Sequence, residues 1–137
     1  MYKMRNKIPD KQEALSIIES SKKDMDYTLT LQISEDSANT IIRNVYECFR
    51  MLGEALLISR GISTSDHIAM INELMKIDLD SSYPLPLLDN LRRLRHSINY
   101  YAYRASKEEA EYAINLAKNN FKILFIKVKE MITNQKL

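Results

Sequence analysis

The sequence predicts an all-α fold, an antiparallel up-and-down bundle of four long helices with one additional short helix as a cap. Only two glycines and three prolines occur among 137 residues, a composition typical of chains with few helix breaks. Apolar residues recur at i, i+3 and i+4 spacing through most of the chain, which is the period of a buried helix face. The sequence contains no internal repeat or linker, so we expect a single domain over residues 1–137.

The first helix is expected to begin at Asp10, which stands three residues before Glu13 as in a capping box, and to fray at residues 27–30. The second is expected from near Ser34 to Gly61, since glycine often follows the last residue of a helix. Their apolar stripes contain Ala14, Leu15, Ile18, Met25 and Leu29, and then Ala38, Ile41, Ile42, Val45, Phe49, Leu52 and Leu56.

A short third helix is expected from Ser65 to Ile77, followed by a loop over residues 78–83. Aspartate and serine in this loop compete with helical hydrogen bonds, and the prolines at 84 and 86 fit only the first turn of a helix. The inward positions of the third helix are Ile68, Ile71, Leu74 and Met75.

The fourth helix is expected from Pro84 to Tyr103, and a capping box formed by Ser106 and Glu109 opens a fifth that ends near Thr133. The core stripe of the fourth helix contains Leu87, Leu91, Leu94, Ile98 and Ala102. That of the fifth contains Ala110, Ala113, Ile114, Ala117, Phe121, Leu124, Phe125, Val128 and Ile132.

The scarce residue types exclude several kinds of site. Two glycines cannot build a glycine-rich phosphate loop. One cysteine excludes an internal disulfide and paired-cysteine zinc sites, and two histidines exclude a three-histidine zinc site, so we expect no metal and no cofactor. No apolar run is long enough to span a membrane, and the amino terminus lacks the apolar region of a secretory signal. We therefore expect a soluble cytoplasmic protein that contacts no membrane.

The fourth expected helix carries the one concentrated basic patch of the sequence. Between Leu85 and Ala105 there are four arginines and one acid, Asp89, so this segment has a charge of +3 in a chain of net charge +2. At 100° per residue its polar residues lie opposite the core stripe or flank it. The candidate residues for binding RNA, a nucleotide or a protein partner are Arg92, Arg93, Arg95, His96, Asn99, Tyr103 and Arg104.

Two interpretations of this face remain open. Its arginines could pair with acids on neighbouring helices and leave an ordinary solvent-exposed surface. However, arginine and tyrosine together are typical of recognition surfaces. A guanidinium group binds phosphate oxygens in a bidentate way, and a tyrosine ring stacks on bases or packs across protein interfaces. His96 could also act as a general acid or base, with Arg92 or Arg95 stabilising the charge on a phosphate under attack, without a metal.

Other polar residues receive simpler interpretations. We interpret His67 as a surface histidine near a helix cap and Cys48 as a partly buried, inert thiol. Charges alternate along the second helix and predict an exposed ladder of ion pairs, formed by Arg43, Glu47, Arg50 and Glu54.

The run from Leu91 to Tyr103, followed by Ser106, Glu109 and Ala110 and a long amphipathic helix, resembles the HEPN superfamily. The resemblance covers residues 85–134 by motif and the whole chain by length and helix pattern. It implies a small helical bundle, often dimeric and often encoded beside a minimal nucleotidyltransferase. Many members are metal-independent endoribonucleases with an arginine, a polar residue and then a histidine about five positions after the arginine.

On this resemblance Arg95 matches the motif's arginine and His96 its polar position, and the catalytic histidine would fall at position 100, which is Tyr100 here. Starting from Arg92 instead places His96 four positions later, one short of the usual spacing. The resemblance therefore implies a degenerate motif, with Arg95, His96 and Tyr100 as the candidate catalytic residues.

We accordingly expect an accessory or binding protein of a nucleotidyltransferase or toxin–antitoxin system, acting as a homodimer through the Arg/His/Tyr face of the fourth helix. It would bind a nucleotidyltransferase or other protein partner, RNA or a nucleotide. The alternatives are a metal-independent endoribonuclease toxin that uses Arg92 or Arg95 with His96 and Tyr100, and a scaffold protein without a ligand.

Overall fold

The computed structural model describes residues 4–79 and 84–135, and the helices within these ranges confirm the all-α prediction. The expected loop over residues 78–83 lies mostly outside the described residues. A short pair of antiparallel strands, which the sequence did not predict, joins Arg5 to Ser63 and Asn6 to Ile62. The elements in the described ranges are β1 (Arg5–Asn6), α1 (Lys11–Thr28), α2 (Ala38–Ser59), β2 (Ile62–Ser63), α3 (His67–Met75), α4 (Leu87–Tyr100) and α5 (Lys107–Thr133).

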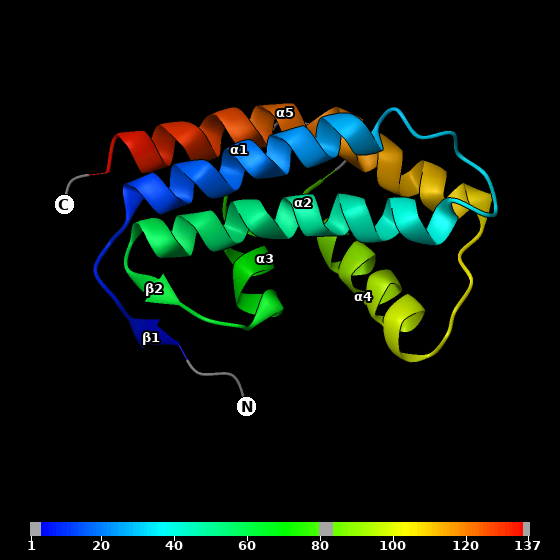
Figure 1. The fold of residues 1–137 in the computed structure, drawn as a ribbon, viewed down its shortest axis with the longest axis horizontal. Coiled ribbons are helices and arrows are strands. Elements are labelled where there is room, and N and C mark those ends of the chain that lie inside the picture. Colours follow the sequence, from blue (N-terminus) through cyan, green and yellow to red (C-terminus); the bar gives the residue numbers. More distant parts are fainter. Residues whose placement is uncertain (1–3, 80–83, 136–137) are drawn as a thin grey trace.

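Helices α1, α2 and α5 lie side by side along the long axis of the molecule, and α3 and α4 lie on the other side of α2 (Figure 1). In Figure 1 the chain runs from left to right through α1, returns through α2, runs obliquely to the right again through α4 and returns through α5, the alternation of an up-and-down bundle. Helix α2 packs against each of the other helices, so it is the central element of the fold. Helix α4 has 14 residues and is shorter than the long helix expected there.

The amino-terminal segment is attached along the end of α2. The Asp10 carboxylate caps α1 by accepting the Glu13 N–H at 2.9 Å, as the sequence predicts. The Lys7 N–H donates to the Gly61 carbonyl at 2.5 Å. Gly61 has φ +80°, and a Cβ there would lie 2.2 Å from the Lys7 carbonyl oxygen, so only glycine suits this turn.

Helix α2 begins later than expected, whereas its end just before Gly61 agrees with the prediction. The side chains of Ser34 and Ser37 each accept the other residue's N–H, at 3.0 and 3.2 Å, which stabilises a turn where the sequence predicted the first helical residues. The helix begins at Ala38 and ends at Ser59, before the left-handed Gly61. All seven expected apolar residues of its stripe are buried.

Helix α3 places three of the four expected residues in or against the core, Ile71, Leu74 and Met75, and differs at the fourth. Ile68 is 47% exposed, whereas Met70 is buried beside Ile71 and Leu74. The helix begins at His67, and the Asp66 carboxylate caps it by accepting the Ile68 N–H at 3.0 Å. The prediction that Ile68 faces inward is therefore wrong.

Helix α4 also departs from its predicted limits. It begins at Leu87 and ends at Tyr100, and the prediction that it runs from Pro84 to Tyr103 is wrong. Ala102 adopts φ +52°, a left-handed conformation that a helix cannot contain, so it is exposed and not part of the core stripe. Leu88 is fully buried, whereas Leu87 is only partly buried.

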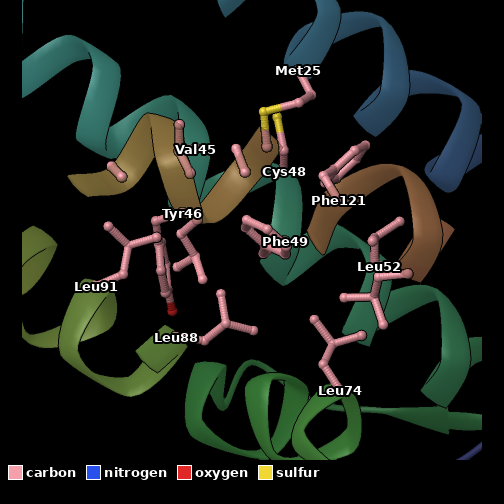
Figure 2. Close-up of a cluster of buried hydrophobic side chains, with 14 of the residues drawn as sticks. Met25, Val45, Tyr46, Cys48, Phe49, Leu52, Leu74, Leu88, Leu91 and Phe121 are labelled. Carbon is pink, nitrogen blue, oxygen red and sulfur yellow. The ribbon is translucent and has the colours of Figure 1, made fainter. Parts of the chain in front are cut away.

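The core lies on both sides of α2. Figure 2 shows Phe49 beside Phe121 of α5, while Tyr46 points towards Leu88 and Leu91 of α4. The Phe49 and Phe121 rings meet edge to face with centroids 5.4 Å apart. All of the expected apolar residues of α5 are buried, and its capping box forms as predicted. No helix in the described part of the chain combines the length and apolarity needed to cross a membrane.

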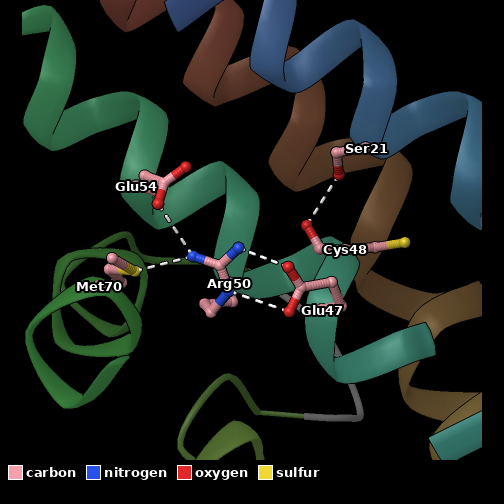
Figure 3. Close-up of polar contacts among 6 residues, drawn as sticks. All are labelled: Ser21, Glu47, Cys48, Arg50, Glu54 and Met70. Carbon is pink, nitrogen blue, oxygen red and sulfur yellow. Dashed lines mark hydrogen bonds and ion pairs between the residues drawn. The ribbon is translucent and has the colours of Figure 1, made fainter. Parts of the chain in front are cut away.

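Arg50 of α2 links α2 to α3. Its guanidinium donates hydrogen bonds to Glu47 and Glu54 within α2 and to the Met70 sulfur of α3 (Figure 3). The Arg50 side chain is only 11% exposed, so the prediction of an exposed ladder is wrong for this residue. Close by, Gly53 allows the helices to approach so tightly that a Cβ there would lie 2.0 Å from the Met70 carbonyl oxygen.

Candidate functional site

A pocket of about 440 Å³ lies between the beginning of α3 and one face of α4. It is lined by both histidines of the chain, His67 from α3 and His96 from α4, and by Tyr46 of α2. The remaining lining residues are Ser65, Asp66, Ile68, Arg92, Arg95 and Tyr100. We call it the α3–α4 pocket.

The helical period of α4 brings four of the predicted residues to this pocket. Arg92, Arg95, His96 and Tyr100 follow one another at spacings of three, one and four residues, so their side chains project from one side of the helix. Arg93 projects to the other side of α4 and lines a separate, shallower groove between α4 and α5. The predicted basic face is thus divided between two surfaces.

Asp89 holds two of the arginines on α4. Arg92 Nε lies 3.0 Å from one oxygen of the Asp89 carboxylate, and a guanidinium nitrogen of Arg93 lies 3.0 Å from the other. The Arg92 side chain is 23% exposed and that of Arg93 is 70% exposed. Arg92 is therefore the less exposed of the two, and it is the one that lines the pocket.

Arg95 packs on Tyr46. Its guanidinium carbon lies 5.2 Å from the centre of the Tyr46 ring, a cation–π contact that fixes the arginine beside the pocket. Burial raises the pKa of Tyr46 to about 12, although the positive charge of Arg95 acts in the opposite direction. The Tyr46 hydroxyl is buried and has no hydrogen-bond partner among residues 4–79 and 84–135. Such a group is costly to bury and is suited to bind a ligand that reaches it.

His67 is the functional candidate that the sequence did not reveal. It is partly buried in the pocket, with its ring centre 6.1 Å from that of Tyr46, and is not a simple surface histidine. Burial lowers its pKa, and the positive charges of Arg50 and Arg95 lower it further. A neutral imidazole at neutral pH can accept a proton or a hydrogen bond from a ligand. Nothing in the local sequence marks His67, because its neighbours in the pocket come from other helices.

His96 lies against two tyrosines at the end of α4. Its ring centre is 4.7 Å from that of Tyr100 and 5.6 Å from that of Tyr101. Tyr100 is 67% exposed and Tyr101 is 74% exposed. The pocket therefore opens onto an exposed aromatic surface.

The other predicted residues do not line the pocket. The Asn99 side-chain oxygen accepts a hydrogen bond from Arg43 Nε at 2.7 Å. The Tyr103 hydroxyl donates to Glu109 at 2.7 Å, the same carboxylate oxygen that completes the capping box of α5, and this bond raises the pKa of Tyr103. Arg104 is exposed in the segment after α4.

Cys48 is not a reactive group. Its thiol is buried, and burial raises its pKa to about 12, which disfavours the thiolate. The neighbouring polar contact is structural, since Ser21 of α1 donates its hydroxyl to the Cys48 carbonyl at 2.7 Å (Figure 3). Within the described ranges, no three His, Cys, Asp or Glu side chains gather as a metal site would require.

Comparison with known proteins gives one match. A family model described as HEPN domain matches residues 14–128, a span that includes every residue of the α3–α4 pocket. Searches of curated proteins and of solved structures found no match.

Proposed function

This chain belongs to the HEPN family, and from that premise we propose that it is a binding protein that holds RNA by a phosphate group in the α3–α4 pocket. The family match supports a HEPN-type function in general. The observation that carries the specific proposal is the convergence of Arg92, Arg95 and both histidines on one pocket.

The chemistry of the pocket suits a phosphate diester. Guanidinium groups bind phosphate oxygens through charge-assisted hydrogen bonds, and Arg95 is held in place by the Tyr46 ring. Of the acids nearby, Asp89 pairs with Arg92 and Arg93, whereas Asp66 caps the first turn of α3 and keeps its charge in the pocket wall. The lining residues include two arginines against one carboxylate, so the pocket carries a net positive charge that attracts a phosphate group.

Binding of a short labelled RNA, measured by fluorescence polarisation, tests the proposal. We expect Arg95→Gln to weaken binding about tenfold. The slope of log affinity against log salt concentration should become shallower by about one, the value for one lost phosphate contact. Arg93→Gln is the matched control, because it removes the same charge from the same helix but lines the other groove. Equal losses for the two variants, or no RNA binding by the wild-type protein, would contradict the proposal.

We further propose that the protein acts in the cytoplasm as a homodimer and serves a nucleotidyltransferase or toxin–antitoxin system, as its family resemblance implies. Light scattering at micromolar concentration tests the dimer, and a monomer there rules it out. Co-purification with the product of an adjacent nucleotidyltransferase gene tests the partnership.

A second candidate is metal-independent RNA cleavage, which the presence of both histidines in one pocket favours. His67 would take the proton of a ribose 2′-hydroxyl as its oxygen attacks phosphorus, and His96 would donate a proton to the departing 5′-oxygen. Arg95 would stabilise the added negative charge, and Tyr100, whose ring lies against that of His96, would supply its hydroxyl as a further donor. The products would carry a 2′,3′-cyclic phosphate and a 5′-hydroxyl.

Cleavage is tested in EDTA by analysing the RNA ends. We expect His67→Ala and His96→Ala each to abolish it, while Arg93→Gln leaves it intact. Intact RNA with the wild-type protein would reject the enzyme and leave the binding role standing.

A further inference from the structure

We propose that Tyr100 and Tyr101 form a stacking platform for an unpaired base, so that the ligand of the α3–α4 pocket is single-stranded RNA. This inference rests on the RNA binding proposed above and names the form of RNA. The platform is the exposed pair of tyrosine rings that flank His96 at the end of α4.

The rings of Tyr100 and Tyr101 are largely exposed to solvent. Tyr100 and Tyr101 are 67% and 74% exposed, although they adjoin a helix whose other face is well packed. Large aromatic rings gain free energy by leaving water, so two adjacent exposed rings indicate a surface that a ligand covers.

The backbone holds the platform in position. The left-handed Ala102 ends α4 and turns the chain directly after Tyr101. Asn39 of α2 then anchors the following segment, since its side chain binds the Tyr103 carbonyl at 3.3 Å and the Ala105 N–H at 2.9 Å. Rings on a fixed backbone lose little conformational entropy when a ligand stacks on them.

The position of the platform relative to the pocket indicates nucleic acid. Tyr100 lines the pocket together with Arg92 and Arg95. The ring of His96 contacts both the Tyr100 ring and the Tyr101 ring, so Tyr101 lies next to the pocket. Aromatic rings beside a phosphate-binding arginine are the arrangement that proteins use for single strands, in which backbone and base are bound by neighbouring groups. Asp89, the acid on α4 nearest to these arginines, is paired with Arg92 and Arg93, which reduces its repulsion of a nucleic-acid strand.

The need for an unpaired base follows from the geometry of stacking. In a duplex both faces of each internal base are covered by neighbouring base pairs, and its edges are paired. A single strand can turn a base outwards and place one face on an aromatic side chain. The platform should therefore discriminate between single-stranded and paired RNA of the same sequence.

The test compares tyrosine variants in binding to a short RNA that carries the fluorescent base analogue 2-aminopurine, whose emission falls on stacking. We expect Tyr100→Ala and Tyr101→Ala each to weaken binding by about tenfold and to abolish the quenching. Tyr100→Phe keeps the ring and should retain both. Tyr27→Ala is the matched control, because Tyr27 is equally exposed, at 66%, but lies on α1.

The outcomes separate this inference from the function on which it rests. If duplex RNA binds as tightly as the single strand, or if Tyr100→Phe loses as much as Tyr100→Ala, the platform is rejected. When Arg95→Gln still weakens binding in that case, RNA binding itself stands. If neither the arginine nor the tyrosine variants affect binding, both proposals fail.

Discussion

The two sides of α2 perform different tasks. On one side, α1 and α5 pack against α2 in an apolar layer, where the polar contact between Ser21 and the Cys48 carbonyl is structural. On the other side, the shorter α3 and α4 carry arginines and histidines that line a pocket. Both sides of α2 therefore contribute buried core residues, but only the side with α3 and α4 also supplies ligand chemistry.

Tyr46 is the residue at which the two sides meet. It is fully buried on α2, yet its ring packs against the Arg95 guanidinium. Its hydroxyl has no hydrogen-bond partner in the described part of the chain. A buried polar group without a partner lowers stability. Its position in the pocket wall suits the Tyr46 hydroxyl to ligand binding, which would offset that cost. Substitutions in the layer of α1, α2 and α5 should therefore change mainly stability, and substitutions in the α3–α4 pocket should also change ligand binding.

The largest effect is expected from Phe49→Ala in the layer. Loss of the ring that meets Phe121 edge to face should lower the free energy of unfolding by about 4 kcal/mol, measured by urea denaturation. Ile123→Ala on the exposed face of α5 is the control and should change it by less than about 0.5 kcal/mol. A small loss for Phe49→Ala would show that the layer is not the main source of stability.

Gly53→Ala tests how α3 is attached to α2. Alanine ordinarily stabilises a helix relative to glycine by about 1 kcal/mol. Here its Cβ would meet the Met70 carbonyl oxygen, so we expect a loss of about 3 kcal/mol and weaker RNA binding, because the α3 wall of the pocket must move. An increase in stability would contradict the close contact of the two helices.

Tyr46→Phe should separate the two tasks. Removing the buried hydroxyl should leave the free energy of unfolding unchanged or raise it by up to about 1 kcal/mol, while RNA affinity falls about fivefold. Tyr112→Phe is the matched control, since the Tyr112 hydroxyl donates to the Leu87 carbonyl at 3.3 Å. This control should lose about 1 kcal/mol of stability and keep its RNA affinity. Loss of stability without loss of affinity in Tyr46→Phe would place Tyr46 in the structural layer alone.

The smallest expected effect is a pH dependence of stability from His67. Its pKa is lowered in the folded protein, so the unfolded chain binds the proton first as the pH falls. Stability should therefore decrease modestly from just above pH 6.5, the ordinary value, down to the lowered pKa. Urea denaturation across this range should show a shallower slope for His67→Gln, and an unchanged slope would contradict burial of the ring.

Much of the helical framework could be predicted because helix signals are local. The capping groups Asp10 and Ser106 and the apolar periodicity of α2 and α5 act within a few residues, and the structure bears them out. The predicted C-terminal end of α4 was wrong because nothing in the local sequence indicates the left-handed conformation of Ala102. The rotation of α3, which exposes Ile68 and buries Met70, likewise depends on its docking to Gly53.

The candidate site was only half predictable. The period of α4 places Arg92, Arg95, His96 and Tyr100 together, but the sequence could not show that Arg93 belongs to another groove. It also gave no sign that Asn99 binds Arg43 or that Tyr103 binds the cap of α5. These partners lie on other elements, and no pattern within one helix reveals them.

By itself the sequence determined the all-α class, the faces of the long helices, the inert character of Cys48 and the basic character of α4, because composition and periodicity act over short stretches of chain. Only the tertiary structure decided that His67 joins His96 in one pocket with Tyr46 between α3 and α4. That decision depends on how closely and at what rotation separate helices pack, which is set by side-chain volumes and by the absence of a Cβ at Gly53.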